Sequence, residues 1–386
     1  MSAIPTMLPK ERIDAVFNHQ PTDKVPIYQA GLSSRVGSAV LGREAYIGGG
    51  IQQYREAKAM WDGEDAHQEF IERSERDAFD IIHTLDLDLV RPAYWRWPTK
   101  PTEKIDENTF LFGDRDATYR VMTFHPELEL FQELDSGPAV ETTFDDLEKQ
   151  VEATEAGIED YAPKAEHFAT LQAAIDEFGD NRGIHGSGIG ICIPRDTIWL
   201  EAVALRPDIV ARFLMCQARR GVKVVPVMKE MGLPYIFGGG DFASKNGPFI
   251  SPKSFHDLQL PAQQVVSKAC DEHGCWHLFA SDGNLWPIAD DLFGESGIRG
   301  FYEIDRRAGM DLTLLRDRFP HLTLLGGVES ETLHLGTVAE VVDHVKTALD
   351  VAKERGSCII GCSNQVVAPT PIGNFWAMME TLKDCR

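Results

Sequence analysis

Two carboxylic acids follow two short apolar runs within residues 275–311. The first run leads into Ser-Asp-Gly-Asn at 281–284, which contains Asp282 and Asn284, and the second run ends at Glu303. Helical spacing of apolar residues between the runs predicts a strand–loop–helix–strand unit. If the strands are parallel, both carboxyls lie at the carboxyl end of one sheet, where α/β enzymes place their chemistry. Asp-Gly-Asn is also an ordinary turn and helix cap, so a structural role is the alternative.

Three further side chains stand at predicted strand ends. Asp241 follows three glycines, which would let the backbone and a ligand approach each other closely. His185 lies in the glycine-rich stretch 183–190 and is a candidate for acid–base work or substrate binding, with a hydrogen-bonded structural histidine as the alternative. Cys362 ends the last apolar run. The stretch around His185 has neither the GxGxxG spacing nor the P-loop pattern, so it predicts no nucleotide site.

A basic residue near the start is a candidate for binding a substrate acid. Residues 25–27, Val-Pro-Ile, indicate a short strand, and Arg35 follows the polar end of that strand. An arginine can hold a carboxylate through two parallel hydrogen bonds. A surface salt bridge is the competing interpretation of Arg35.

The first part of the chain predicts helices and an insertion. Residues 9–19 and 51–82 have helical spacing, the second pattern being broken near Gly63, and residues 85–92 alternate like a strand. Two apolar runs joined by Gly-Asp predict a β-hairpin within an insertion at about 90–130.

The second part repeats strand and helix patterns. Residues 127–178 are acidic and helix-prone, and from residue 182 to a closing helix at 371–382 strands and helices alternate. Such alternation indicates parallel strands with helical crossovers. We therefore predict a single (β/α)8 TIM-barrel domain over residues 1–386, with an N-terminal helical extension. Five strand ends would meet at one active-site mouth, and these carry His185, Asp241, Asp282, Glu303 and Cys362.

Composition excludes several classes of protein. The formal charge of −22 makes a nucleic-acid or anionic-membrane surface a poor expectation. Seven cysteines without regular spacing predict reduced thiols rather than a disulfide scaffold. The start has no apolar signal region, and no run of about 18 uncharged apolar residues occurs. These features predict a cytoplasmic protein that binds no membrane.

Several segments, in order along the chain, resemble the uroporphyrinogen decarboxylase superfamily, which includes corrinoid-dependent methyltransferases as well as tetrapyrrole decarboxylases. The resemblance extends from about residue 9 to residue 382. It rests on ERIDAVFNHQPTDKVPI near the start, GGGDFASKNGPFISPKSF in the middle, then SDGN, EIDRRAGMDL, LLGGV and the closing TPIGNFWAM. The resemblance implies the same barrel and a site at its mouth.

Two departures from the family pattern bear on the activity. The decarboxylases are similar to one another in an arginine-rich motif, whose arginines are absent from residues 27–32 here, Ile-Tyr-Gln-Ala-Gly-Leu. The methyltransferases hold zinc with a His-x-Cys motif and a later cysteine. Ala280 and Asp282 stand at the first two of these positions, whereas Cys362 falls at the third and Glu303 at a nearby carboxylate. Strand alternation puts His277 on the other face from Asp282, so His277 is no obvious replacement.

The resemblance and the carboxylates together predict a methyltransferase. It would move a methyl group from a small methoxylated or methylated substrate to a corrinoid carried on a separate protein, because the chain lacks the Asp-x-His-x-x-Gly loop that binds corrinoids. The predicted catalytic residues are Asp282, Glu303 and Asp241, with His185, Arg35 and Asn284 binding substrate. Cys362 and Glu303 are the candidate ligands of a zinc ion, and a homodimer is expected from the family. A decarboxylase or lyase, and a non-catalytic binding protein, are the alternatives.

Overall fold

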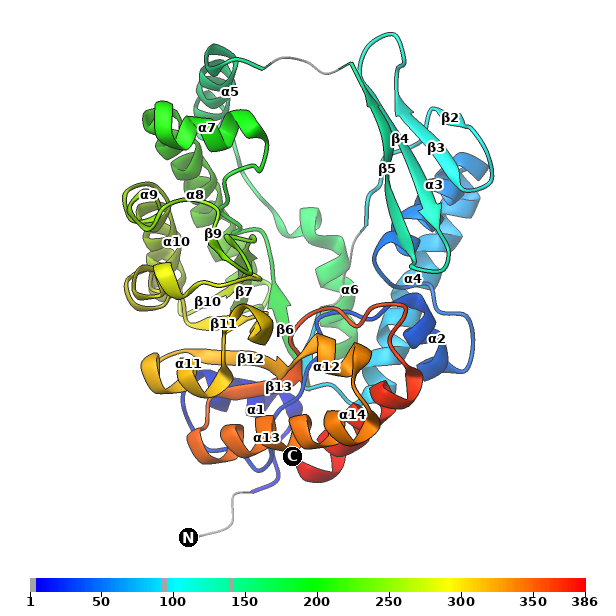
Figure 1. Cartoon of the computed structure of the whole chain (residues 1–386), viewed down its shortest axis with the longest axis vertical. Helices are drawn as coiled ribbons and strands as arrows, with labels where there is room; N and C mark the ends of the chain where they lie inside the picture. Colours follow the sequence, from blue (N-terminus) through cyan, green and yellow to red (C-terminus); the bar gives the residue numbers. More distant parts are fainter. Residues whose placement is uncertain (1–4, 92–95, 139–141) are drawn as a thin grey trace.

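Seven parallel strands form the central sheet of the computed structural model, which describes residues 5–91, 96–138 and 142–386 (Figure 1). The order of the strands in the sheet agrees with their order in the sequence, as a chain of helical crossovers requires. From one edge to the other they are β1 (Leu89–Val90), β6 (Gly183–Gly186), β7 (Tyr235–Gly239), β10 (Trp276–Ala280), β11 (Gly300–Tyr302), β12 (Thr323–Val328) and β13 (Cys358–Cys362).

Residues 27 and 28 join the two edges of this sheet. Ile27 forms a parallel bridge with Ile360 of β13, and Tyr28 forms one with Leu89 of β1. The short strand predicted at 25–27 is thus reduced to two bridging residues. The predicted parallel α/β architecture is confirmed as a curled sheet of seven strands with an additional bridging segment between its edges, whereas the complete eight-stranded barrel stays a prediction.

Alternate strand residues separate into two hydrophobic clusters. Phe301 packs in a large cluster with the helices, which we call the outer cluster, whereas its neighbour Tyr302 packs in a second cluster with residues of α1 (Pro9–Phe17). The second cluster, which we call the inner cluster, takes its side chains from nearly every strand of the sheet and from residue 28. This division follows from the period of two in a strand, and it decides which side chains can reach the interior of the sheet.

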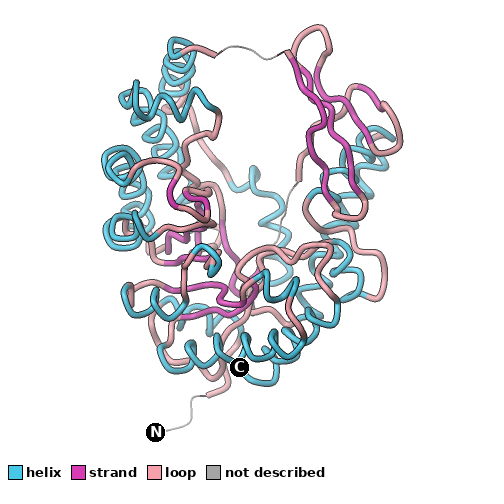
Figure 2. Tube along the Cα trace, viewed as in Figure 1, coloured by secondary structure: helices cyan, strands magenta, loops and turns pink. Residues whose placement is uncertain are grey.

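Helices lie around the outside of the sheet (Figure 2). Most of the predicted helices are found close to their expected bounds; an example is the closing helix, predicted at 371–382 and found at residues 372–385. The first long helix after β6 is α8 (Pro207–Glu230). The other helices after β6 are α7 (Thr197–Leu205), α9 (Pro252–Ser254), η2 (Phe255–Gln259), α10 (Leu260–Glu272), η3 (Trp286–Ile288), η4 (Asp290–Glu295), η5 (Arg306–Ala308), α11 (Leu312–Arg318), α12 (Ser330–Leu335), α13 (Val338–Arg355) and α14 (Ile372–Cys385). In the described ranges we find no helix with the length and apolarity needed to span a lipid bilayer.

Within the described residues, four α-helices precede the first strand. They are α1, α2 (Ser34–Leu41), α3 (Gly50–Asp62) and α4 (Glu64–Leu85). The break predicted near Gly63 is confirmed, because Gly63 separates α3 from α4 with a positive φ of 134°. The region predicted as helix-prone contains α5 (Phe144–Ala156), η1 (Ala165–Phe168) and α6 (Ala169–Phe178).

A separate antiparallel sheet occupies the predicted insertion. The predicted hairpin is β3 (Thr109–Gly113) paired with β4 (Tyr119–His125), and β2 (Glu103–Lys104) and β5 (Leu130–Gly137) extend it to four strands. The aromatic side chains of these strands pack against α3; Tyr54, for example, stacks on Phe124 with ring centroids 4.2 Å apart. Residues 92–95 of the predicted insertion lie outside the described residues.

Strand β5 differs from the prediction, which gave residues 127–178 as helix-prone. Among its eight residues only Phe131 is buried, and most of the others are exposed polar or acidic residues. A strand with so few buried positions lacks the alternation by which strands are recognised in a sequence. Pairing with β4 decides its conformation instead.

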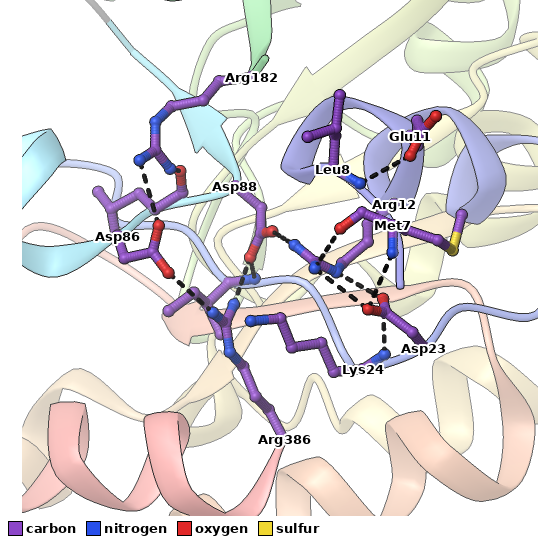
Figure 3. Close-up of polar contacts among 12 residues, drawn as sticks. Met7, Leu8, Glu11, Arg12, Asp23, Lys24, Asp86, Asp88, Arg182 and Arg386 are labelled. Carbon is purple, nitrogen blue, oxygen red and sulfur yellow. Dashed lines mark hydrogen bonds and ion pairs between the residues drawn. The ribbon is translucent and has the colours of Figure 1, made fainter. Parts of the chain in front are cut away.

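A buried ion network lies where α1, the start of β1 and Arg386 meet (Figure 3). Asp88, which is fully buried, pairs with Arg12 of α1 at 2.8 Å and with Arg386 at 2.5 Å. The same carboxylate accepts a hydrogen bond of 2.9 Å from the backbone N–H of Ile27. One aspartate thus links the bridging segment, the first helix and the last helix.

Candidate functional site

Three carboxyl groups predicted from separate strand ends come together in the structure. Asp241, Asp282 and Glu303 each place a carboxylate oxygen within 4.8 Å of the other two. We call these residues the carboxyl cluster. They follow β7, β10 and β11, three adjacent strands, so the predicted convergence at the carboxyl end of the sheet is confirmed for them.

The backbone of Glu303 departs from ordinary strand geometry. Phe301 packs in the outer cluster and Tyr302 in the inner one, so simple alternation would turn Glu303 outward. Instead Glu303 has a φ of 72°, a left-handed conformation that is uncommon for a residue with a side chain. Its carboxyl group therefore reaches Asp241 and Asp282.

Hydrogen bonds fix the other two members. The backbone N–H of Asp282 donates to Asp241 at 3.2 Å, and the Asn364 side-chain nitrogen lies 2.9 Å from both carboxylate oxygens of Asp282. The second oxygen of Asp241 forms an ion pair of 2.6 Å with Arg195. The residues that make these contacts lie in the loops after β6, β7, β10 and β13, so four loops fix the positions of Asp241 and Asp282.

The glycines before Asp241 serve backbone packing. A Cβ atom on Gly239, whose φ is 148°, would lie 2.6 Å from the carbonyl oxygen of Ala280. One on Gly240 would lie 2.9 Å from the Cβ of Cys192. Bare backbone at these positions thus lets β7 and its loop approach their neighbours, which brings Asp241 close to Asp282.

Burial and like charge keep protons in the cluster. Burial, followed by the negative charges of Asp282 and Asp241, raises the pKa of Glu303 to about 8, and Arg91 opposes the shift. Burial and the charge of Asp241 raise the pKa of Asp282 to about 6, against the hydrogen bond from Asn364. Near neutral pH Glu303 therefore holds a proton and Asp282 is mostly ionised.

Three supporting residues were not predicted from the sequence. Arg91 lies near Glu303, with its guanidinium 5.7 Å from the Phe237 ring centroid and donating to the Ala30 carbonyl at 3.3 Å. Arg91 directly follows β1, so the strand-end criterion applied elsewhere would have found it. Asn364 likewise lies just after a strand, β13, so the same criterion applies to it. Arg195 lies in a loop away from any strand end, and its sequence position does not predict its role.

His185 is neutral and is not part of the carboxyl cluster. Its ring Nδ1 lies 3.2 Å from the Gly186 carbonyl oxygen, and burial together with the nearby Arg91 lowers its pKa to about 3. His277 lies on the outer face, as alternation predicts, with its Nδ1 2.8 Å from the Ser267 hydroxyl. A substrate-binding role for His185 stays a prediction.

Asn284 and Arg35 are engaged elsewhere. The Asn284 side-chain oxygen accepts from the backbone N–H of Trp286 at 3.1 Å, which is the local turn given as the alternative for this segment. Arg35 is exposed at the start of α2, where its backbone N–H donates to Glu129 at 2.8 Å. Their binding of substrate likewise stays a prediction.

The side chains present here do not fit the thiol-activating zinc site of the methyltransferases that the sequence resembles. Cys362 is fully buried, burial raises the pKa of its thiol to about 12, and it packs with Ile360 in the outer cluster. Zinc binds the thiolate, which this environment disfavours. Among the described residues, the group that could hold a metal ion is the carboxyl cluster, whose all-oxygen donors suit a hard cation.

Two cavities border the carboxyl cluster. An apolar cavity of about 240 Å³ is bounded by Asp241 and Arg195 and is otherwise lined mainly by apolar side chains: Ile193, Leu200, Phe242, Phe249, Ile250 and Phe255. A polar cavity of about 260 Å³ reaches Asp282 and Asn364 and is lined by charged residues that include Arg306 and Glu329. A ligand can therefore approach the cluster from apolar and from polar surroundings.

Comparisons with known proteins agree with this architecture. The sequence model of the uroporphyrinogen decarboxylase (URO-D) family matches residues 202–385, a range that contains the whole carboxyl cluster. A solved structure, a methyltransferase from Methanosarcina mazei, is similar with a TM-score of 0.61 and 17% identity, over 98% of this chain and 99% of that one. No curated protein matches the sequence significantly. The predicted resemblance to the uroporphyrinogen decarboxylase superfamily is thus confirmed for residues 202–385, the part of the chain that holds the carboxyl cluster.

Proposed function

We propose that this protein is a methyltransferase that takes a methyl group from a small methoxylated or methylated compound and delivers it to a corrinoid carried on a separate protein. The observation that carries the proposal is the position of the Glu303 carboxyl group within 4.8 Å of two other carboxyl groups, which together with burial raise its pKa to about 8. A partly buried acid with a pKa near 8 suits general-acid catalysis at neutral pH.

Glu303 would protonate the leaving oxygen of a methyl ether. As the carbon–oxygen bond breaks, the methyl group passes to the acceptor, and the oxygen takes the Glu303 proton and leaves as a hydroxyl. The corrinoid, when its carrier protein is docked, supplies the nucleophile that accepts the methyl group. Glu303 becomes a carboxylate in this step and regains its proton from solvent.

Asp282 and Asp241 would position and tune this acid. The Asp282 carboxylate, oriented by Asn364, raises the proton affinity of Glu303, and the Asp241–Arg195 pair borders the apolar cavity. Zinc takes no part in the proposed step, because the residues present lack the cysteine thiolates that hold zinc in a thiol-activating site.

The same geometry argues against the decarboxylase of a polycarboxylic acid. Three carboxyl groups within 4.8 Å of one another, in a chain of net charge −22, would repel such a substrate. The nearby Arg195 is already paired with Asp241.

The proposal is tested by supplying the protein with a panel of methoxylated and methylated donors and with reduced cobalamin in place of the corrinoid protein. Mass spectrometry follows loss of the methyl group from the donor and its gain by cobalamin. Glu303→Gln should lower the rate by about 100-fold or more, the usual contribution of a general acid. Glu354→Gln, on the exposed surface of α13, is the matched control and should leave the rate unchanged.

Failure of every donor with the wild-type protein would contradict the proposed activity. Equal rates in the wild type and in Glu303→Gln would contradict the role of Glu303. Release of carbon dioxide from a carboxylic acid in place of methyl transfer would favour the decarboxylase alternative.

A further inference from the structure

The apolar cavity beside Asp241 has the features of a binding pocket for a ring. Its lining includes three phenylalanines, of which Phe242 and Phe255 meet edge to face with ring centroids 5.6 Å apart. Three aliphatic residues, Ile193, Ile250 and Leu200, complete the apolar lining. Walls of this kind bind apolar and aromatic surfaces in preference to small polar molecules.

The size of the cavity fits an aromatic ring rather than a one-carbon donor. Its volume is about 240 Å³. A cavity of ~150 Å³ lined by Leu, Ile and Phe is enough to bind benzene. A substituted benzene thus fits, whereas methanol or methylamine would leave most of the apolar wall without contacts.

The charges at the cavity mouth disfavour a cationic ligand. Aromatic walls next to a carboxylate are the usual setting for binding a methylated ammonium group. Here the Arg195 guanidinium already fills that role, because it pairs with Asp241 at 2.6 Å and lies 5.2 Å from the Phe249 ring centroid. A cationic ligand would have to compete with Arg195 for both partners, whereas an uncharged ring would not.

We propose that this cavity holds the aromatic ring of the methyl donor, so that the substrates are uncharged aryl methyl ethers. The inference deepens the proposed methyl transfer and rests on it for the identity of the reacting group. Asp241 belongs to both the cavity wall and the carboxyl cluster. A methoxy group projecting from the ring past Asp241 comes into reach of Glu303, since the two carboxyls lie within 4.8 Å of each other.

Direct binding tests this assignment without any acceptor. Titration calorimetry would compare 2-methoxyphenol and its demethylated product, benzene-1,2-diol, with tetramethylammonium and methanol. The two aromatic compounds should bind to the wild-type protein, and the other two should not. Binding of tetramethylammonium as tight as that of 2-methoxyphenol would overturn the assignment.

Two variants locate the binding. Ile250→Trp, in a loop beside the cavity, fills the space and should weaken binding of 2-methoxyphenol by about tenfold or more, equivalent to ~1.4 kcal/mol. Phe249→Ala removes a partly exposed side chain from the cavity wall and should weaken binding of 2-methoxyphenol several-fold. Leu205→Trp, on an exposed position of α7 outside the cavity, makes a comparable change and should have no effect. Unchanged binding in both cavity variants would overturn the proposal.

The outcomes separate the ligand class from the activity. If 2-methoxyphenol binds in the cavity but no donor loses a methyl group, the ring assignment stands and the proposed methyl transfer fails. If methanol or methylamine donates methyl groups equally well in Ile250→Trp and no aromatic compound binds, the methyl transfer stands and the ring assignment fails.

Discussion

Glu303 combines an unusual backbone conformation with a partly buried carboxyl group of raised pKa. Its φ of 72° is of a kind that costs on the order of 1–3 kcal/mol for a residue other than glycine. The surrounding strands must supply this free energy, because the conformation is what brings the carboxyl group into the cluster. Strain of this kind at a partly buried carboxyl group with a raised pKa is the pattern expected of a functional residue.

The raised pKa of Glu303 predicts a specific pH dependence of stability. Below about pH 4.5 the carboxyl is protonated in both folded and unfolded chains, but up to about pH 8 only the folded chain keeps the proton. This contribution to the free energy of unfolding is therefore lost as pH rises through about 8. Glu303→Gln removes that loss, so the variant should be more stable than the wild type at pH 9 by on the order of 2 kcal/mol.

Urea unfolding of the wild type and the variant between pH 5 and pH 9 measures the difference. The stability of Glu354→Gln should follow that of the wild type at every pH. A constant difference in stability between wild type and Glu303→Gln over this range would show that Glu303 is ionised throughout and would contradict its raised pKa.

At the residue scale, strand-end reasoning predicted the carboxyl cluster but not all of its surroundings. Asp241, Asp282 and Glu303 could be predicted because adjacent parallel strands end at one edge. The positive φ of Glu303 could not, since no glycine marks it. Cys362 was expected from the family pattern, yet it packs with Ile360 in the outer cluster while the intervening Ile359 packs in the inner one. Strand alternation, which puts His277 on the outer face of the sheet, puts Cys362 there as well.

At the scale of the elements, the bridging segment at residues 27 and 28 depends on a glycine. A Cβ atom on Gly361 of β13 would lie 1.9 Å from the carbonyl oxygen of Tyr28, an impossible contact with backbone. No side-chain rearrangement can relieve this contact, so substitution must displace one of the two segments. The close approach that joins the edges of the sheet therefore requires glycine at this position.

Gly361→Ala should destabilise the protein by about 3 kcal/mol, the upper part of the range for overpacked sites. Gly373→Ala in α14 is the matched control, because a Cβ atom there meets no other atom within 4 Å, and its effect should stay within about 1 kcal/mol. Thermal unfolding of both variants gives the comparison. Equal melting temperatures for the two would mean that the edges of the sheet are not held together at Gly361.

The elements themselves were predictable to different degrees. Helices α1 and α14 match their predicted ranges closely, and strands are present before Asp241 and Glu303 as predicted. The helix predicted after Asp282 is instead a 3-10 turn and a π-helix, and Pro287, which has no N–H to donate, lies within the 3-10 turn. Strand β5 was missed because its conformation comes from pairing with β4 and not from a buried face of its own.

At the scale of the whole molecule, Asp88 links segments from both ends of the described chain. Its fully buried carboxylate is shared by Arg12, Arg386 and the backbone of Ile27 (Figure 3). Removal of one partner of a buried charge usually costs about 3–5 kcal/mol, because the remaining charge is left poorly compensated. Arg12 remains beside Asp88, so a smaller cost is expected when Arg386 is changed.

Arg386→Gln should therefore lower the free energy of unfolding by about 2 kcal/mol. Arg318→Gln breaks the exposed pair with Asp290, where both side chains are about half exposed or more, and should cost less than about 1 kcal/mol. Chemical denaturation of the two variants provides the measurement. A cost for Arg386→Gln no greater than for Arg318→Gln would mean that the network adds little to the stability of the fold.

The measurement that most directly tests the account is the pH dependence of methyl transfer from 2-methoxyphenol to reduced cobalamin between pH 5 and pH 9. The wild-type rate should fall as pH rises through about 8, where Glu303 loses its proton. Glu303→Gln should be slower by about 100-fold or more and should lack this fall. A wild-type rate that rises across the range, or a variant that keeps both the rate and its pH dependence, would contradict the assignment of Glu303 as the acid.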